Sequence, residues 1–320
     1  MPTLHEVPEV AQLLATILTA EPISHGALAV VPLLAPNLDD PDWLTLEDAG
    51  DRAHITEVSE AGSVPFLKVA NDADQPLLLL DGEELIGAKQ NRILNTTVLV
   101  AAHTEVTIPV SCVEQGRWGY RGRQFHPGDA SLFASLRAKK AAWVSRSVRA
   151  GRGHMADQGR VWAQLACRAN ELDVDSLTGA MRDVYARHET DMTAARQALA
   201  AQPGQVGALV FVGSRWVGLE LLAGPGLFAR AWPGLCAGYA ADIIGRKPEP
   251  WQRLDSGAVL EALDQGQIEL APTVGLGEEY RLSTASLVGA TLVAQGRVAH
   301  LMVFPAAEVA GASEGAEAQR

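Results

Sequence analysis

The chain has 320 residues, of which 48% are hydrophobic and 20% are charged, and its formal net charge is −12. This length allows one large domain or two ordinary ones, and the composition is typical of a soluble globular protein. The negative charge argues against a general nucleic-acid-binding protein, so we expect nucleic acid to be an unlikely partner. No apolar run approaches the roughly 18 residues of a membrane span, so we expect no membrane partner.

The three cysteines, Cys112, Cys167 and Cys236, lie far apart and form no CxxC pattern. This usage predicts reduced thiols and a cytoplasmic protein, and it gives no sign of a zinc site. A nucleophilic cysteine needs a base within reach, and the spacing identifies no histidine partner for Cys112. A buried structural cysteine is therefore the favoured interpretation of Cys112.

The first portion, residues 1–128, is predicted to be rich in strands. A helix is expected at 8–20, where apolar residues recur at helical spacing. Apolar runs predict strands at 26–34, 55–58, 64–69, 77–80, 98–100 and 106–110. A basic stretch with several glycines, 119–128, is predicted to be a loop.

The second portion, residues 129–201, is predicted to be a helical block. Three helices are expected, at 129–148, 157–172 and 176–200, with Asp129 and Ser176 as N-caps of the first and third. From Gln115 to Arg168 there are eleven Lys or Arg residues and only two acids. A solvated helix face that pairs with the acidic remainder is the favoured interpretation, and a local anion site is the alternative.

The third portion, residues 202–307, is predicted to contain both strands and helices. Strands are predicted at 206–212, 216–222, 280–282, 287–293 and 298–304, and helices at 227–244 and 256–263. Residues 308–320, rich in Ala, Gly and Glu, are expected to form a disordered tail. The sequence thus predicts an α+β protein with two β-rich portions flanking a helical block, and these portions are compatible with one compact domain.

Short matches between the two β-rich portions suggest an internal repeat related by a pseudo-two-fold axis. The triplets at 26–28, 82–84 and 99–101 recur in the same order at 207–209, 277–279 and 292–294. Matches of three common residues also arise by chance. If the repeat is real, the two Gly-Glu-Glu turns would approach each other.

The stretch from Pro76 to Trp118 is the strongest candidate for a functional site. Asp81, Glu83 and Glu84 follow an apolar strand within four residues, and carboxylates this close repel one another. One of them could hold a proton for acid–base chemistry, or Asp81 and Glu83 could bind a divalent ion such as Mg²⁺. A solvent-exposed acidic hairpin is the alternative.

Cationic and amide side chains follow directly, from Lys89 to Arg92. Arginine and asparagine suit the planar recognition of phosphate or of a base edge, and a polar edge strand is the alternative. Glu114 and Arg117 are expected to be ligand contacts or an internal ion pair. Acidic and basic groups within one stretch favour a phosphate-bearing ligand.

Two candidates lie near the end of the chain. Arg281 follows the second Gly-Glu-Glu turn and is a second candidate for anion binding. His300 lies in the apolar run VAHLMVF, where a core histidine with satisfied hydrogen bonds is favoured over a catalytic one.

The runs DGEELIGAKQNRILNTTVLV, IPVSCVEQGRW, DQGRVW, GEEYR and VAHLMVF resemble the ARG- and rhodanese-phosphatase-superfamily-associated protein domain. The resemblance extends from about Pro22 to Pro305 and is most specific between Gly82 and Trp118. Its function is unknown, and its name refers to gene neighbourhoods with ADP-ribosyl glycohydrolases and rhodanese- or phosphatase-type proteins. The positions that it singles out are Glu83, Gln90, Arg92, Glu114, Arg117, Trp118, Gln158, Trp162, Arg281 and His300.

The resemblance implies a role around ADP-ribose or another nucleotide of NAD metabolism, although neighbourhood alone does not establish chemistry. The leading hypothesis is that the chain binds or processes such a nucleotide, with Glu83 or Glu84 as acid–base group or metal ligand. Arg92 and Arg117 would hold phosphate. The sequence leaves open whether the protein is an enzyme, such as a hydrolase, or a non-catalytic ligand-binding or protein-interaction module.

Overall fold

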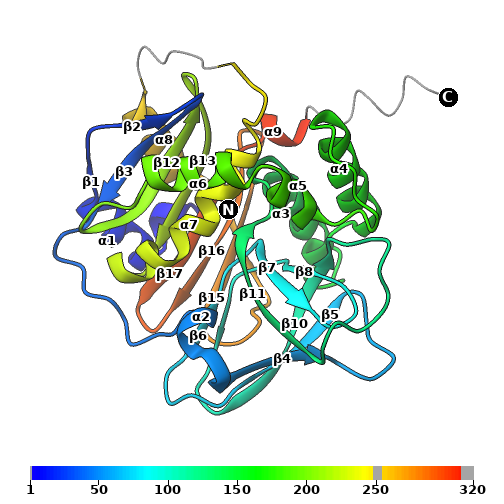
Figure 1. Cartoon of the computed structure of the whole chain (residues 1–320). Helices are drawn as coiled ribbons and strands as arrows, with labels where there is room; N and C mark the ends of the chain where they lie inside the picture. Colours follow the sequence, from blue (N-terminus) through cyan, green and yellow to red (C-terminus); the bar gives the residue numbers. More distant parts are fainter. Residues whose placement is uncertain (1, 248–253, 311–320) are drawn as a thin grey trace.

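The computed structural model describes residues 2–247 and 254–310, which form the predicted mixture of helices and strands in an α+β fold (Figure 1). A large antiparallel sheet lies on one side of the molecule, and a closed six-stranded barrel lies on the other. Among the described residues, no helix has the length and hydrophobicity needed to cross a membrane.

The large sheet has the strand order β1-β3-β12-β13-β17-β16-β15-β14, and β2 also pairs with β3. Its strands are β1 (Leu18–Thr19), β2 (Ile23–His25), β3 (Leu28–Leu34), β12 (Gln205–Val212), β13 (Arg215–Leu222), β14 (Ile268–Ala271), β15 (Glu278–Ser283), β16 (Leu287–Ala294) and β17 (Arg297–Pro305). The central strands are buried along almost their whole length because helices cover both faces, which explains their nearly continuous apolar sequences.

Successive residues of the central strands enter different cores, as the strand period of two requires. On one face, Val210 packs with α3 (Ala134–Arg149) and α7 (Pro225–Ala241). On the other face, Leu209 packs with the 3₁₀-helix η1 (Leu4–Glu6), α1 (Pro8–Thr16) and α8 (Ser256–Asp264).

The barrel closes in the order β10-β5-β4-β11-β7-β8, and a two-stranded ribbon of β6 and β9 packs against its core. Its strands are β4 (Ala53–Glu57), β5 (Phe66–Asn71), β7 (Glu83–Gly87), β8 (Arg92–Leu94), β10 (Thr104–Cys112) and β11 (Gln124–Ser131). The ribbon consists of β6 (Leu77–Leu79) and β9 (Val98–Val100), and α2 (Leu46–Ala49) and the 3₁₀-helix η2 (Gly50–Arg52) precede the barrel. The stretch from Pro76 to Trp118 therefore builds most of one side of the barrel.

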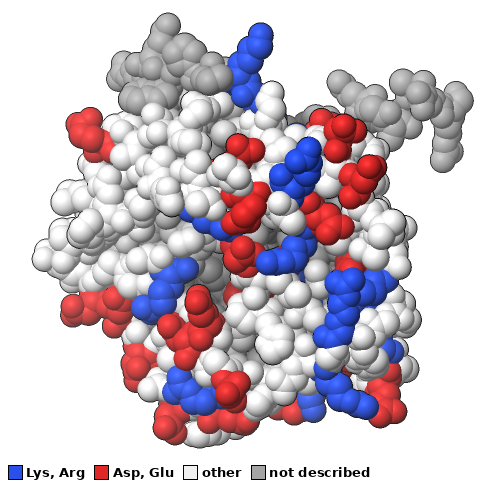
Figure 2. Space-filling view, in the orientation of Figure 1, with Lys and Arg blue, Asp and Glu red and all other residues white. Residues whose placement is uncertain are grey.

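Helices α4 (Gln158–Glu171), α5 (Met181–Arg187) and α9 (Ala307–Ala310) lie beside the barrel and α3, whereas α6 (Glu189–Ala198) packs against α7 and β2 (Figure 1). The hydrophobic cluster under α3 and α7 takes residues from all three portions of the sequence, including Leu78, Ala138 and Phe304. Figure 2 shows that charged side chains of both signs are interspersed over the barrel and these helices.

The predicted start of the first helix in the helical block, at Asp129, is wrong. Asp129 lies in strand β11, and α3 begins five residues later at Ala134. Strand β11 contains Pro and Gly and pairs with an irregular register, so its sequence resembles a loop. The N-terminus of α3 is capped from a distance by Asp242, whose carboxylate accepts hydrogen bonds of 2.7 Å from the amide and hydroxyl of Ser135.

The helix expected at 176–200 is two shorter helices, because the chain leaves helical geometry at His188 between α5 and α6. Ser176 does not cap a helix, since it lies five residues before Met181, the first residue of α5. Its hydroxyl accepts a hydrogen bond from the amide of Ala180, which precedes α5. Asp157 does cap α4. The tail predicted from Glu308 begins with α9, and residues 311–320 lie outside the described part of the chain.

The short sequence matches do not correspond to one repeated arrangement of strands. The first Gly-Glu-Glu triplet, Gly82–Glu84, opens strand β7 of the barrel, whereas the second, Gly277–Glu279, opens β15 of the large sheet. Gly82 has a φ of +79°, and a Cβ there would lie 2.7 Å from Nε of Arg137. That glycine is therefore required by a local close approach.

Candidate functional site

The predicted site residues fall into separate groups within the fold. Arg92 and its sequence neighbours lie at one end of the barrel, where β4 and β10 end and β8 begins. We call this region the barrel mouth and define it by residues whose side chains interact there: Glu57, Lys89, Gln90, Arg92, Cys112, Trp118 and Trp162.

Antiparallel pairing places the mouth residues side by side. Arg92 is the first residue of β8 and lies opposite Cys112, the last residue of β10. Glu57 ends β4, and its carboxylate Oε1 lies 3.8 Å from Nη2 of Arg92. Residues separated by tens of positions in the chain thus meet at one edge of the barrel.

Arg92 is fully buried, yet part of its guanidinium has no hydrogen-bond partner. Its Nη1 donates to the backbone oxygen and to Oε1 of Gln90, both at 3.1 Å. Among the described residues, nothing accepts a hydrogen bond from its Nε or Nη2. Burial lowers the pKa of Arg92 from its ordinary value, which is the expected response of a cation with incomplete compensation.

Two further buried polar atoms at the mouth also have no partner among the described residues: Oε2 of Glu57 and the indole N–H of Trp162. Buried polar groups in native proteins are paired in the great majority of cases, with protein, water or ligand. These unpaired polar atoms make the barrel mouth the candidate binding region of the fold.

An exposed aromatic surface covers the barrel mouth. The side chain of Trp118 is 50% exposed and that of Tyr120 is 46% exposed. The ammonium of Lys89 lies 5.1 Å from the ring centroid of each, and the guanidinium carbon of Arg92 lies 5.8 Å from that of Trp118. A half-exposed indole between cationic groups can stack on a planar, electron-rich ring.

Glu114 and Arg117 form an internal ion pair rather than a free pair of ligand contacts. Nη2 of Arg117 lies 2.6 Å from Oε2 of Glu114, and the same oxygen accepts the amide of Asn91. Burial alone would raise the pKa of Glu114, but these donors outweigh it and hold the pKa below its ordinary value. This pair fixes the loop that carries Trp118.

The side chain of Gln158 forms hydrogen bonds inside the fold. Its side-chain amide accepts from the backbone N–H of Cys112 and donates to the backbone oxygen of Cys112, both at 2.8 Å. It extends the pairing of β10 and joins α4 to the barrel. The amide of Gln90 likewise donates to the backbone oxygen of Glu114 at 2.9 Å.

Cys112 is buried, as predicted, and its thiol donates to Oε1 of Gln90 at 2.9 Å. Burial raises the pKa of this thiol, although the nearby backbone of Glu114 and the charge of Arg92 oppose the rise. The thiolate, which is the nucleophilic form, is therefore disfavoured. Cys236 is buried and Cys167 exposed, and all three are free.

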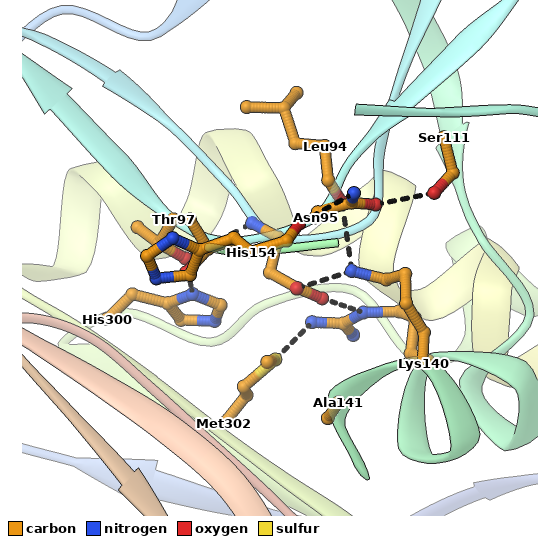
Figure 3. A network of polar contacts seen from close by, with 12 residues as sticks. Leu94, Asn95, Thr97, Ser111, Lys140, Ala141, His154, His300 and Met302 are labelled. Atoms are coloured by element: carbon orange, nitrogen blue, oxygen red, sulfur yellow. Dashed lines mark hydrogen bonds and ion pairs between the residues drawn. The ribbon is translucent and has the colours of Figure 1, made fainter. Parts of the chain in front are cut away.

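Asp81 belongs to a second group, a buried charge network between the barrel and the large sheet (Figure 3). Its carboxylate lies 2.5 Å from Nζ of Lys140 and 3.5 Å from Nε of Arg137, both on α3. Lys140 also donates to the backbone oxygen of Leu94 at 2.9 Å. Arg137 continues the network to Glu220 of β13 at 2.5 Å.

The charges of this network are paired, and the pairing outweighs the effect of burial for Glu220 but not for Lys140. Burial alone would raise the pKa of Glu220, but Arg137 and His300 lower it to about 2. Burial lowers the pKa of Lys140 to about 8 in spite of Asp81. Such a network fixes the position of α3 against both sheets.

His300 and Arg281 are satisfied inside the fold, so the favoured interpretation of His300 agrees with its contacts. Nδ1 of His300 lies 2.7 Å from the hydroxyl of Thr97 (Figure 3). Its Nε2 lies 2.9 Å from Glu220. Arg281 donates to Glu279 at 2.9 Å and to two groups of α3. The anion-binding role predicted for Arg281 would require these contacts to break.

The second Gly-Glu-Glu segment does reach the stretch from Pro76 to Trp118. Oε2 of Glu279 accepts a hydrogen bond of 3.0 Å from Thr96 and lies 2.9 Å from Nε2 of His154. The contact runs through Thr96, not through the first Gly-Glu-Glu turn.

Glu83 and Glu84 lie at the start of β7, four and three positions before the mouth end of that strand. Glu84 is buried, and its Oε2 lies 3.0 Å from Arg182, which also binds Asp129. Glu83 faces a different surface, a cavity beside α7. The structure does not bring these carboxylates and Arg92 into one pocket. Glu84 lies opposite Ile93 and so on the other face of the strands from Arg92, and Glu83 lines a cavity that Arg92 does not line.

The residues present do not fit the divalent metal site considered for Asp81 and Glu83. Asp81 already binds two cationic side chains, and a metal ion would have to displace Lys140. Among residues 2–247 and 254–310, no group of three or more His, Cys, Asp or Glu side chains is placed to hold a metal ion.

Sequence reasoning missed Glu57 and the partners of Asp81. Glu220 carried a readable signal, since a single acid within the apolar run VGLELL requires an internal partner when the strand is buried. No signal in the sequence indicated that Glu57 is buried, because a glutamate at the end of a short strand is normally exposed.

Neither the curated proteins nor the solved structures gave a match. The family model of the ARG and Rhodanese-Phosphatase-superfamily-associated Protein domain matches residues 16–304, which include the barrel, the barrel mouth and the large sheet. The chain therefore belongs to the family of ARG and Rhodanese-Phosphatase-superfamily-associated Protein domains.

Proposed function

We propose that the barrel mouth binds a nucleotide-type ligand of the ADP-ribose class. The observation that carries the proposal is Arg92, a fully buried guanidinium with two N–H groups that no described residue accepts. An anionic group such as a phosphate oxygen would satisfy both and would compensate the charge.

The groups around Arg92 match the other parts of such a ligand. Trp118 offers a half-exposed indole on which a base could stack, at about 1–3 kcal/mol per stacked base in comparable sites. The unpaired carboxylate oxygen of Glu57 could accept a ribose hydroxyl. Mouths of β-barrels are common places for ligand sites.

The proposal is one of binding rather than catalysis. Glu83 and Glu84, the predicted acid–base residues, do not belong to the mouth. Glu114 is held in its ionised form by Arg117, which suits a structural carboxylate and not a general acid.

Thermal-shift measurements with ADP-ribose, NAD, ADP and ribose 5-phosphate test the proposal, followed by an assay for ligand turnover. ADP-ribose should raise the melting temperature of the wild type and not that of Trp118→Ala, which removes an exposed ring and leaves the core intact. Arg123→Ala, an exposed arginine nearby, is the matched control and should keep the shift. The absence of a shift with every nucleotide would exclude this function, and turnover would show that the mouth is also catalytic.

A further inference from the structure

The cavity beside α7, which Glu83 lines, has a volume of about 260 Å³ and lies between the start of β7, the second half of β11 and helix α7. Its walls are largely aliphatic and include Leu80, Leu222 and Leu235. This volume is slightly below the roughly 300–1,000 Å³ of pockets for drug-sized ligands, so the cavity suits a small molecule. None of the residues that define the barrel mouth lines it.

The cations that line this cavity already have acidic or carbonyl partners. Nε of Arg230 lies 2.9 Å from Asp48. Nη2 of Arg196 donates to the backbone oxygen of Asp129 at 2.7 Å, and Asp129 is in turn paired with Arg182 at 2.9 Å. Neither arginine is available as a full positive charge for a ligand.

Glu83 differs from the two arginines and Asp129 of the cavity wall, which are all paired. Its Oε2 accepts the backbone N–H of Leu80 at 3.0 Å, and it forms no ion pair with any residue in the described ranges. Burial raises the pKa of Glu83 to about 7, and only the Leu80 amide opposes the rise. The exposed Glu47 adds a second carboxylate at the rim.

We propose that this cavity binds a small aliphatic primary ammonium ion, with the ammonium at Glu83 and the hydrocarbon chain against Leu80, Leu222 and Leu235. An ammonium ion is a compact charge with three donors, so it can pair with one carboxylate and leave the existing ion pairs intact. Its chain buries apolar surface at roughly 0.8 kcal/mol per CH₂ group. The proposal does not depend on the function of the barrel mouth.

Isothermal titration of the full chain with n-butylammonium tests the proposal, with n-butanol as the uncharged ligand of similar shape. Butylammonium should bind at pH 8 and butanol should not bind measurably. Nα-acetyl-lysine methylamide forms a second arm: if it also binds, the ammonium can come from a lysine side chain, and if it does not, the source is a small free amine. Failure of both amines to bind, or equal binding of butanol, would overturn the proposal.

The dependence on pH and a matched pair of variants assign the binding to Glu83. Glu47, Asp129, Arg196 and Arg230 also face the cavity, so the variants are needed to show which group controls the pH dependence. Affinity should fall about tenfold from pH 8 to pH 6 as Glu83 takes up a proton. Glu83→Gln, which resembles the protonated acid and should remain folded, should abolish binding.

Glu84→Gln is the control, because burial raises the pKa of Glu84 to about 7 as well, but Glu84 does not line the cavity. This variant should keep both the affinity and its pH dependence. Unchanged binding by a folded Glu83→Gln variant, or loss of the pH dependence in Glu84→Gln alone, would contradict the assignment.

Discussion

At the scale of single residues, two buried cations differ in how many of their N–H groups have a hydrogen-bond partner. Lys140 has Asp81 and the carbonyl oxygen of Leu94 within hydrogen-bond distance. Arg92 is equally buried, but two of its N–H positions have no partner among the described residues. The first arrangement holds the fold together, and the second is suited to a ligand.

Replacement of Lys140 by methionine should destabilise the protein strongly, because it leaves the carboxylate of Asp81 buried with a weaker partner. Removal of one member of a buried ion pair typically costs about 3–5 kcal/mol. Lys140→Met should lower the free energy of unfolding in urea by this amount, and the adjacent Lys139→Met, which removes a contact with Gln164, by under about 1 kcal/mol. Equal losses in the two variants would contradict the role of the network.

The raised pKa of Glu84 predicts how stability depends on pH. Burial raises the pKa of Glu84 from 4.5 to about 7, although Arg182 opposes the rise. The folded state therefore binds a proton more tightly than the unfolded state, so the stabilisation is complete below about pH 4.5 and is lost as pH rises through 7.

Between pH 6 and pH 8, Glu84 should account for a loss of roughly 1 kcal/mol in the free energy of unfolding. Urea unfolding across this range should show a smaller loss in Glu84→Gln than in the wild type. A variant with the same or a steeper pH dependence would be inconsistent with the raised pKa.

At the scale of elements, the position of α4 depends on the side chain of Gln158, which hydrogen-bonds to the backbone of β10. Gln158, the first residue of α4, makes both hydrogen bonds to the backbone of Cys112 that a neighbouring strand would make. The helix and the end of β10 are thereby held together beneath the barrel mouth.

Gln158→Ala should free the backbone groups of Cys112 and destabilise the protein by about 1–3 kcal/mol. Hydrogen exchange followed by mass spectrometry should show faster exchange in the segment that contains Cys112. Gln164→Ala, on the same helix, loses only the contact with Lys139 and should leave exchange in that segment unchanged. Unaltered exchange in Gln158→Ala would show that α4 is held by other contacts.

Elements with regular apolar patterns were predictable from the sequence, whereas elements defined by tertiary contacts were not. The strands at 206–212 and 298–304 and the helix from Asp157 emerge at nearly the predicted bounds. Strand β11 was missed because its pattern is polar and its pairing partners lie far along the chain. The cap of α3 was assigned to Asp129 because a cap from Asp242 leaves no local signal.

The sequence predicts which residue types the candidate site contains, but it does not predict which of these residues lie together. Gln90, Arg92 and Trp118 come from one stretch of the sequence and do lie near one another, because Gln90 lies just before β8 and the segment after β10 brings Trp118 to Arg92. Sequence distance suggests that Glu83 lies with them, yet Glu83 begins β7 at the end away from the mouth and lines the cavity beside α7. Closeness in sequence sets which strand a residue occupies, and the face depends on registers that only the fold supplies.

At the scale of the whole molecule, the barrel and the sheet share a core and a charge network. The cluster under α3 and α7 joins Leu78 and Ile93 of the barrel region with Val210 and Phe304 of the sheet. The chain of contacts from Asp81 through Arg137 to Glu220 crosses the same boundary. Neither part is expected to retain its packing without the other.

Differential scanning calorimetry should therefore show a single unfolding transition. For a two-state transition, the calorimetric enthalpy equals the van 't Hoff enthalpy. Two resolved transitions, or a calorimetric enthalpy well above the van 't Hoff value, would mean that the barrel and the sheet unfold independently.

The most direct test of ligand binding at the barrel mouth is a titration of the ¹⁵N-labelled protein with ADP-ribose, monitored through the tryptophan indole N–H signals. The signals of Trp118 and Trp162 should shift, because both side chains belong to the mouth. Those of Trp43 and Trp232 should not, because they donate to Gln295 and Leu199 elsewhere in the fold. A titration that leaves Trp118 and Trp162 unchanged would contradict the account.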